Sequence, residues 1–514
     1  MTMKELLLEY KKTKEDLSNK EDLLAEQKIK NQKLAHDNVL LKEAIKLLKQ
    51  SKFGAKSEKL LPLEEQYFLF DEVEFLNRQS PENLELDIGI GDDQITVSGH
   101  KRLRGKRKPL PKELPREEII IDLADEDKIC IHDGTPLKKI GEDVSEKLDV
   151  IPMQAKVIRT VRIKYGCPCC AEGVRTPPVP ACLIPKSIAT PGLLAFIAVS
   201  KYQDALPFYR LENIFERYGI EISRETMARW MIRLAAGLRP LYNILQDEIL
   251  ASDYIHTDET TVQVLKEKDR KAESKSYMWV RARSYANPII LFHYAPSRSG
   301  DVAKEILLDF KGALQVDGYA GYNRFCISEY IKRMGCWAHV RRKFKDVQKV
   351  SGVGSKLALQ MLKLIQNLYN AERKIKNYSI DEKTKTRALL SKPILKIIKD
   401  YVDQNVSKVP PGSTIGKAFS YLLSEWPTLE IYLEDGRYHI DNNFIENSIR
   451  PFAIGRKNWL FSDSVDGAEA SAIIYSLIET AKANNKEPYQ YLKSIIDQIP
   501  NAQSIEDFEK LLPF

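Results

Sequence analysis

The stretch Asp253–Leu265 (DYIHTDETTVQVL) decides the fold of this chain. It is rich in β-branched and aromatic residues, which favour a β-strand. Side chains alternate between the two faces of a strand, so His256, Asp258 and Thr260 share one face. Asp258 lies in the middle of a mostly apolar run, where a buried carboxylate without a partner is costly. The pattern therefore indicates a functional acid, although a surface-facing Asp258 is the other interpretation.

The residues after this strand predict a mixed sheet. Further strands are expected at Tyr277–Arg283, Pro288–Tyr294 and Gly312–Asp317, with a helix at Ser299–Phe310 before the last of them. This β-β-β-α-β order is that of a ribonuclease-H-like domain. Its first and fourth strands are neighbours, so we expect Asp258 and Asp317 to meet at one edge of the sheet.

A third acid follows in the stretch Asp441–Pro451 (DNNFIENSIRP). Asp441 or Asn442 is expected to cap a helix that Pro451 ends. Glu446 then lies in the first turn, with Arg450 four residues later on the same face. Taken alone, this is also the pattern of a capped surface helix with one ion pair. The two acids upstream favour Glu446 as a third ligand, oriented by Asn442, Asn443 and Asn447.

Three carboxylates at one site suit Mg²⁺ or Mn²⁺, which prefer oxygen ligands. In the expected arrangement Asp258 bridges two ions, Asp317 holds one and Glu446 the other, as in two-metal phosphodiester chemistry. His339 and Arg450 would lie near developing charge. Arg456 and Lys457 belong to a basic run with an aromatic residue and are expected to face the DNA backbone.

Other segments predict modules that bind DNA. Leu211–Gly219 reads as a helix, and Ser223 caps a second one, which is the helix-turn-helix outline, with Arg224 and Arg229 toward the major groove. An ordinary αα-hairpin has the same outline. A flexible basic arm is expected to contact phosphates through Lys101, Arg102, Arg104, Lys106 and Arg107, although a solvated linker is the alternative.

Cysteines cluster where a zinc-ribbon-like module is expected. Cys130, Cys167 and Cys170 are the candidate ligands, with Asp133 or His132 as the fourth. A module that has lost its metal and folds by packing alone is the other interpretation. Further along the chain, Cys336 and His339 have C-x-x-H spacing, but no second pair is near them in the sequence, so no zinc site is predicted there.

Composition places the chain among globular proteins. It has 514 residues, 43% of them hydrophobic, and a net charge of +7. Its first residues are charged, and its longest apolar run, Gly192–Val199, is far shorter than a membrane span. Seven cysteines are too few for a disulfide scaffold. We therefore expect a soluble cytoplasmic protein, associated with the nucleoid and without a membrane partner.

Several motifs resemble those of transposases of the insertion sequence 66 family. They are Lys52–Leu60 (KFGAKSEKL), the two cysteine knuckles, His256–Val262 (HTDETTV), Gln315–Tyr322 (QVDGYAGY), Cys336–Phe344 (CWAHVRRKF) and Asp441–Phe461 (DNNFIENSIRPFAIGRKNWLF). The resemblance covers nearly the whole chain. It implies a DDE triad of Asp258, Asp317 and Glu446, strand cutting and joining with a divalent metal, and small accessory transposition proteins. Asp133 departs from the family pattern, which has cysteine there.

The resemblance also bears on the C-x-x-H spacing of Cys336 and His339. A similar motif follows the second acid in several transposase groups, which implies that His339 lies near the scissile phosphate.

The expected organisation is a multidomain α+β protein with a ribonuclease-H-like α/β catalytic domain. The modules are a coiled coil at 1–50 that forms a homo-oligomer, a charged linker with the basic arm at 51–117, a zinc-finger-like module at 118–182, a helical DNA-binding domain at 183–250, the catalytic domain at 251–467 with a helical insertion at about 350–428, and a C-terminal helical module at 468–514. For the N-terminal helix, a single solvated helix is the alternative.

The leading functional hypothesis is a transposase that cleaves and joins double-stranded DNA ends. One alternative is a DNA-binding protein without catalysis, and another is a hydrolytic nuclease of the same fold. The presence of all three acids argues against the first alternative, because a binding protein does not need them.

Overall fold

The structure is a computed structural model that describes most of the C-terminal two thirds of the chain. The described residues are scattered positions between 20 and 45, residue 118, and the ranges 154–165, 175–307, 310–319, 321–322, 330–348 and 353–514. Two compact units are present, Val73–Pro177 on one hand and Met1–Glu72 with Pro178–Phe514 on the other. The basic arm and the four candidate zinc ligands lie outside the described residues.

A central sheet organises the region after residue 178. The helices are α4 (Pro191–Tyr202), α5 (Phe208–Glu216), α6 (Arg224–Leu250), α7 (Gly300–Ile306), α9 (Trp337–Gln348), α10 (Val353–Lys374), α11 (Ile380–Val406), α12 (Thr414–Leu429), α13 (Asn443–Trp459), α14 (Val465–Ala483), α15 (Pro488–Gln498) and α16 (Ile505–Glu509), with short 3₁₀ turns at Ile431–Leu433 and Ile499–Asn501. The strands are β1 (Tyr254–Lys266), β2 (Lys275–Arg283), β3 (Ile289–Ala295), β4 (Gly312–Gln315), β5 (Ile331–Met334) and β6 (Ser462–Ser464).

The sheet runs in the order β3-β2-β1-β4-β5, and β6 pairs with the far end of β1. The first three strands form an antiparallel meander, whereas β4 and β5 are parallel to β1. The expected neighbourhood of the first and fourth strands is thus confirmed. The predicted strands agree with β1 to β4 within two residues at each end, but β5 and β6 were not predicted.

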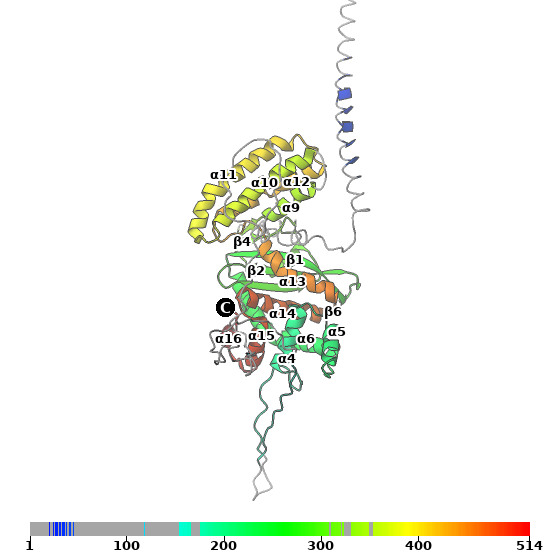
Figure 1. Ribbon diagram of the computed structural model, residues 1–514, viewed down its shortest axis with the longest axis vertical. Helices are drawn as coiled ribbons and strands as arrows, with labels where there is room; N and C mark the ends of the chain where they lie inside the picture. Colours follow the sequence, from blue (N-terminus) through cyan, green and yellow to red (C-terminus); the bar gives the residue numbers. More distant parts are fainter. Residues whose placement is uncertain are drawn as a thin grey trace, which may run out of the picture. The chain divides into compact units, whose positions relative to one another are not determined.

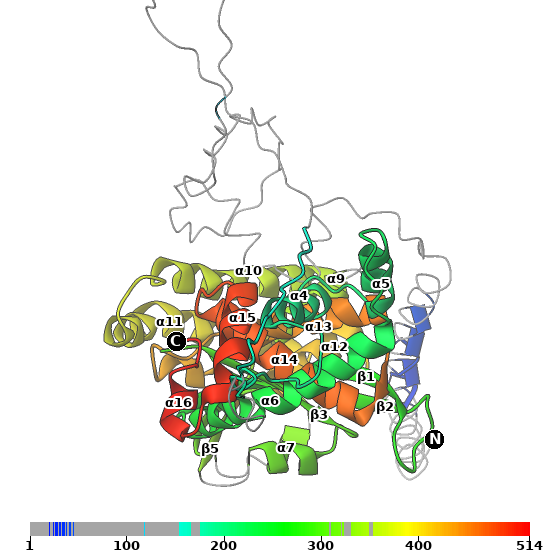
Figure 2. The same cartoon turned by 90° about the horizontal axis from the view of Figure 1, so that it is seen from below.

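Helices α6 and α14 pack against the β3 side of the sheet (Figure 1). The view from below shows α14 alongside α6 and α15 (Figure 2). Because β3 is an edge strand, its outer backbone groups need partners. Hydroxyl groups of α14 supply them: Ser476 accepts from the Phe292 N–H at 2.8 Å, and Thr480 bonds both the N–H and the carbonyl of Ile290 at 3.0 Å. The small, buried residues of α14 allow this close approach.

Three long helices, α10 to α12, are inserted between α9 and α13. They occupy the expected position of the helical insertion, and α10 and α12 pack against α9 (Figure 1). Buried Arg387 of α11 anchors them, since it pairs with Glu372 at 2.7 Å and donates to the carbonyls of Tyr432, Asp435 and Tyr438. Those carbonyls belong to the segment that leads into α13, so the insertion supports the start of that helix.

The prediction that Pro451 ends the late helix is wrong. Helix α13 continues through Pro451 to Trp459. Proline lacks an N–H and therefore leaves the carbonyl four residues earlier, at Asn447, without its helical partner. Asn447 is exposed, so water can take that role, and buried Ile449 and Phe452 on either side of the proline hold the helix in place.

The structure also bears on two further predictions, the Ser223 cap and the helix expected at residues 1–50. Ser223 caps α6 as predicted, because its Oγ accepts the Thr226 N–H at 3.3 Å. The described residues between 20 and 45 are helical and exposed, Leu24, Leu34 and Leu41 among them. The coiled coil itself stays a prediction. Within the described residues, no helix is long and apolar enough to cross a bilayer.

Candidate active site

Asp258 and Asp317 lie level with each other on neighbouring strands. The last paired residues of parallel strands β1 and β4 are His256 and Gln315. Asp258 and Asp317 each follow two residues later, so both side chains leave the same face of the sheet as that pair. Parallel neighbours are about 4.8 Å apart. The register therefore brings the two predicted carboxylates together, although Asp317 lies just beyond β4 rather than within it.

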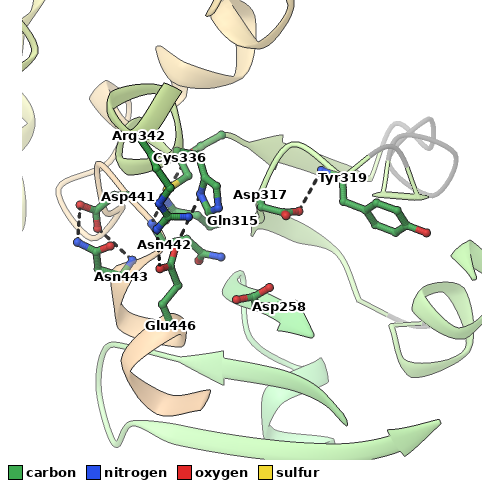
Figure 3. A network of polar contacts seen from close by, with 12 residues as sticks. Asp258, Gln315, Asp317, Tyr319, Cys336, Arg342, Asp441, Asn442, Asn443 and Glu446 are labelled. Carbon is green, nitrogen blue, oxygen red and sulfur yellow. Dashed lines mark hydrogen bonds and ion pairs between the residues drawn. The ribbon is translucent and has the colours of Figure 1, made fainter. Parts of the chain in front are cut away.

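Glu446 approaches these acids from the first turn of α13. Helix α13 packs along β1, and Figure 3 shows the Glu446 carboxylate at the same end of the sheet as Asp258 and Asp317. The N-terminus of a helix carries partial positive charge, which favours a carboxylate in its first turn. The structure thus brings the three predicted acids to one place.

The electrostatics of Asp258 are consistent with three acids close to one another. Burial raises the pKa of Asp258 well above its usual value, and the negative charges of Glu259, Asp317 and Glu446 raise it further. Its described hydrogen bond is from the neighbouring backbone, where the Glu259 N–H donates at 2.9 Å. Among the described residues no Lys or Arg forms an ion pair with Asp258. A concentration of negative charge of this kind is what a divalent cation neutralises.

A fourth acid, Glu259, was missed by the sequence analysis. Its side chain is only 1% exposed and pairs with Arg298, and the Tyr322 hydroxyl donates to it at 2.6 Å. Arg298 also lies 3.9 Å from Asp317 and stacks on the Tyr319 ring, with 3.8 Å to the ring centroid. The adjacent acids in the first strand were a visible signal for Glu259, whereas Arg298 lies in a loop without any periodic pattern.

The position of Asp317 is fixed by its own turn. Its carboxylate accepts the Tyr319 N–H at 3.0 Å, and its carbonyl accepts Arg333 at 3.0 Å. Arg333 is held in turn by Glu425 of α12 at 2.7 Å. The inserted helices therefore brace the second acid as well as the start of α13.

Glu446 faces two basic residues of α9. Arg342 lies 3.3 Å from one carboxylate oxygen, and the His339 Nδ1 lies 3.8 Å from the other. Burial lowers the pKa of His339, and the positive charges of Arg342 and Lys343 lower it further, against the opposing effect of Glu446. The ring therefore favours its neutral form. His339 lies beside the third acid, next to the candidate site.

Asn442 links the start of α13 to the sheet and to α9. Its side chain bonds the His256 Nδ1 at 2.9 Å and donates to the Thr257 carbonyl at 3.3 Å, and its N–H donates to the Cys336 sulfur at 3.2 Å. Its carbonyl accepts the Glu446 N–H at 3.2 Å. Asn442 thus fixes the start of α13, whereas its predicted role in orienting the Glu446 carboxylate stays a prediction.

The other two asparagines have different positions. Asn443 bonds Asp441, both through its N–H at 3.1 Å and through its side chain at 3.0 Å, and Asn447 is exposed. Asp441 itself is buried and accepts the Tyr369 hydroxyl at 2.9 Å. Asn442 is the N-cap residue of α13, without a side-chain capping bond, and the neighbouring pair of Asp441 and Asn443 ties this end of the helix to the inserted helix α10.

The residues predicted to contact DNA or phosphate fall into two groups. Arg224 and Arg229 are exposed in the first turns of α6, and Lys457 is exposed on α13. Arg456, in contrast, turns inward and donates to the hydroxyls of Thr260 and Thr261 at 3.1 and 2.9 Å, so it joins α13 to β1. Arg450 is half-buried on α13, one turn after Glu446.

Family models match four parts of the chain. The model described as "Transposase IS66 family" matches residues 186–470, which include all three acids. A zinc-finger binding domain of transposase IS66 matches residues 127–171, and the IS66 C-terminal element matches 476–514. A model described as "Transposase C of IS166 homeodomain" matches residues 40–119.

Similar proteins of comparable length occur in Sinorhizobium fredii. Uncharacterized protein y4jD is 34% identical over 468 residues, which cover 86% of this chain and 90% of that protein. Uncharacterized protein y4qI is 33% identical over 508 residues, which cover 96% and 91%. The family model spans more than half of the chain and includes the acids that the register brings together, so this protein belongs to the IS66 family of transposases.

Proposed function

We propose that the chain is a DDE transposase that cleaves and joins the DNA ends of its element by metal-dependent phosphoryl transfer. Membership of the family supports a transposase role. The proposed catalytic residues are Asp258, Asp317 and Glu446, with His339 and Arg450 in support. The substrate would be double-stranded DNA, both as element ends and as target.

One observation carries this proposal. Asp258 and Asp317 are level on parallel strands, Glu446 faces them from α13, and the pKa of Asp258 is raised by burial and by the other acids. A fold that needed Asp258 only for stability would supply it with a cation or with hydrogen-bond donors from side chains. Asp317 and Glu446 have Arg298 and Arg342 beside them, but among the described residues Asp258 has no ion pair, which is typical of an acid that binds a cation.

The sheet supports a ribonuclease-H-like catalytic domain. Its order, β3-β2-β1-β4-β5, combines an antiparallel meander with two parallel strands after a crossover through α7. We infer that this domain spans 251–467, with the helices from about 350 to 428 inserted in it. The remaining modules would then be a helical DNA-binding domain at 183–250 and a helical module at 468–514.

The donor set fits Mg²⁺ or Mn²⁺, because it consists of carboxylate oxygens. Asp258, Asp317 and Glu446 are the residues that would hold these ions. When bound, two such ions activate an attacking water or 3′-hydroxyl and stabilise the leaving oxygen of a phosphodiester.

Neighbouring residues of the chain prepare this site. Arg298 neutralises Glu259, so that acid adds less repulsion to Asp258 and Asp317. Arg342 holds one oxygen of Glu446, and its side chain is 55% exposed, so it also remains accessible to a phosphate. His339 lies beside Glu446 in a form that favours the neutral ring, which suits a hydrogen bond to a phosphate oxygen.

The exposed residues Arg224, Arg229 and Lys457 support DNA contact, together with the basic arm at residues 101–107. The zinc-finger match supports a structural zinc held by Cys130, Cys167 and Cys170 with Asp133. An N-terminal coiled coil would make the protein a homo-oligomer. We also propose that it acts in the cytoplasm on nucleoid DNA, with small accessory transposition proteins.

The test is cleavage of labelled element ends by the purified full chain. We expect Mg²⁺-dependent cleavage by the wild type and at least about a hundredfold less by Asp258→Ala. Asp463→Asn is the matched control, since it changes an exposed acid on β6 beside the same strand. Equal cleavage by the wild type and Asp258→Ala would remove Asp258 from the triad.

A joining assay with pre-cut 3′ ends separates the alternatives. We expect strand-transfer products. Cleavage without joining would favour a hydrolytic nuclease, and end binding without any product under any divalent metal would favour a DNA-binding protein without catalysis.

A further inference from the structure

Three different donor atoms converge beside the acid cluster. Cys336 immediately precedes α9, His339 lies in the first turn of α9, and Glu446 lies in the first turn of α13. One donor atom from each of them, sulfur, ring nitrogen and carboxylate oxygen, lies within 4.8 Å of the other two. The described residues contain no other such group of His, Cys and carboxylate side chains. Figure 3 shows Cys336 and Glu446 on the same side of the site.

Two of these atoms have no satisfactory partner without a cation. The Nδ1 of His339 and the Oε1 of Glu446 are 3.8 Å apart, and both are buried. Among the described residues, neither atom has a hydrogen-bond partner. A separation of 3.8 Å is too long for a hydrogen bond between them. Buried polar atoms without partners are costly, and a positive ion between these two satisfies both when the proton of the neutral His339 ring is on Nε2.

The sulfur of Cys336 is a buried hydrogen-bond acceptor. Burial and the charges of Asp441 and Glu446 raise the pKa of its thiol, so a bound cation has to displace the thiol proton. The side chain is buried, with 4% of it exposed, and the backbone N–H of Asn442 donates to Sγ at 3.2 Å. A hydrogen bond of this kind orients a metal-bound thiolate and stabilises it. The donor is itself fixed, since the Asn442 side chain bonds His256 and the Thr257 carbonyl.

The distances suit a small tetrahedral ion. Zinc lies about 2.3 Å from sulfur and about 2.0–2.2 Å from nitrogen or oxygen, so its ligand atoms are roughly 3.3–3.7 Å apart. The His339–Glu446 distance of 3.8 Å is already close to that value. The sulfur lies within 4.8 Å of both atoms, so it needs to approach by at most roughly 1.1–1.5 Å, which a change of side-chain torsion provides.

We propose that Cys336, His339 and Glu446 form a three-ligand site for a thiophilic divalent cation of the Zn²⁺ class. A thiolate and an imidazole select Zn²⁺ or Co²⁺ over Mg²⁺, which prefers oxygen ligands only. Three protein ligands leave one position open for water or a phosphate oxygen. This site uses none of the residues expected to hold zinc in the zinc-finger-like module, Cys130, Cys167 and Cys170.

The site has a consequence for the proposed reaction, and this consequence alone rests on the proposed function. Glu446 belongs both to the zinc site and to the acid triad. A zinc ion held by Cys336 and His339 would bind a carboxylate oxygen of Glu446 that an ion at the acid triad also needs. Zinc is therefore an inhibitor that competes with Mg²⁺ for one shared carboxylate.

Metal binding tests the site without any activity measurement. The metal-free full chain is titrated with Co²⁺ and, separately, with Zn²⁺, and thiolate-to-cobalt absorption and bound metal are measured. We expect the wild type to bind one equivalent more than Cys336→Ser. Cys182→Ser is the matched control, since it removes an exposed thiol elsewhere in the chain, and it should bind as the wild type does.

Because Cys336 is buried, Glu446→Gln serves as a second variant at a partly exposed position. Each variant is compared after its unfolding curve shows a folded protein. We expect Glu446→Gln to weaken the additional equivalent at least about tenfold. Equal stoichiometry and affinity in the wild type, Cys336→Ser and Glu446→Gln would overturn the site.

Cleavage with Mg²⁺ in the presence of increasing Zn²⁺ tests the competition. Each protein is normalised to its own rate without zinc. We expect half-inhibition of Cys336→Ser to need at least tenfold more zinc than that of the wild type, and equal values would refute competition for Glu446. If no protein cleaves under any metal, the proposed function fails, whereas the metal titration still decides the zinc site.

Discussion

Asp258 and Glu267 are two acids of the same strand region with opposite surroundings. Glu267, just after β1, is buried and held by Arg270 at 2.7 Å, by the Ser276 hydroxyl at 2.9 Å and by the Tyr294 hydroxyl. Asp258, within β1, is surrounded by other acids, which raise its pKa together with burial. Glu267 therefore has an ion pair and hydrogen bonds from side chains, whereas among the described residues Asp258 has no ion pair. We infer that Glu267 stabilises the protein, whereas Asp258 is kept available for a cation.

The largest expected effect is on activity. Asp258→Asn should lower the rate of Mg²⁺-dependent cleavage by roughly a thousandfold, because the acid that is expected to bridge the two ions is lost. The same change should leave the free energy of unfolding without metal unchanged or slightly higher, since it removes repulsion with Asp317 and Glu446. Cleavage rates and urea unfolding of the same preparation measure both. A variant that is strongly destabilised but still active would contradict this account, because Asp258 would then stabilise the protein, as we infer for Glu267.

Glu267→Gln should have the converse effect. It leaves Arg270 without its buried partner, so we expect the free energy of unfolding to fall by roughly 2–3 kcal/mol. The cleavage rate per folded molecule should stay that of the wild type. Urea unfolding and an assay corrected for the folded fraction measure these quantities. Restoring part of the stability with Arg270→Met as a second change would confirm that the loss comes from this pair.

Asp441 is a third buried acid, which has hydrogen-bond partners as Glu267 does but a raised pKa as Asp258 does. Its effect on stability should therefore depend on pH. It has hydrogen bonds from Tyr369 and Asn443, but burial raises its pKa from 3.8 to about 6. Below about pH 4, Asp441 carries the proton in both the folded and the unfolded chain, so its raised pKa does not lower the free energy of unfolding. As pH rises from 4 through 6, the folded chain keeps a proton that the unfolded chain releases, so stability falls.

We therefore compare unfolding of the wild type and Asp441→Asn without metal at pH 4 and pH 7. The stability of the wild type relative to the variant should be lower at pH 7, by at most roughly 3 kcal/mol. Groups that titrate equally in both proteins cancel in this difference. A difference that does not change with pH, or that grows in favour of the wild type, would contradict the raised pKa.

The smallest effect is expected at an exposed acid. Asp463 of β6 pairs with Lys266 at 2.7 Å, but both side chains are well over half exposed. Asp463→Asn should change the free energy of unfolding by less than about 0.5 kcal/mol. A loss as large as that of Glu267→Gln would mean that burial is not what separates these acids. Urea unfolding under the same conditions measures it.

The neighbouring positions of Asp258 and Asp317 could be predicted from the sequence, because they follow from strand periodicity and strand order. Asp258 lies on a long strand with a clear alternating pattern, and Asp317 lies at the end of a short apolar strand. Parallel pairing of these strands then brings the acids level without any further information. The late helix was predicted from its capping residues, although its end was not, because buried residues beyond Pro451 hold the helix together.

The surroundings of the acids were not predictable from the same patterns. Arg298 reaches Glu259 from a loop, and Arg333 reaches the carbonyl of Asp317 from β5, a strand too short to show a pattern. Arg456 was expected to face DNA because it lies in a basic run, yet the register of α13 against β1 turns it toward Thr260 and Thr261. Local sequence does not determine which face of a helix meets which strand.

Stabilisation by Mg²⁺ tests most directly whether the three acids form a site for a hard divalent ion. At about a hundred times the dissociation constant, a bound ion raises the free energy of unfolding by about 2.7 kcal/mol. We predict that Mg²⁺ stabilises the wild type and Asp463→Asn by such an amount and stabilises Asp258→Asn much less. Equal stabilisation of all three proteins, or of none, would contradict the assignment of Asp258, Asp317 and Glu446 as a metal site.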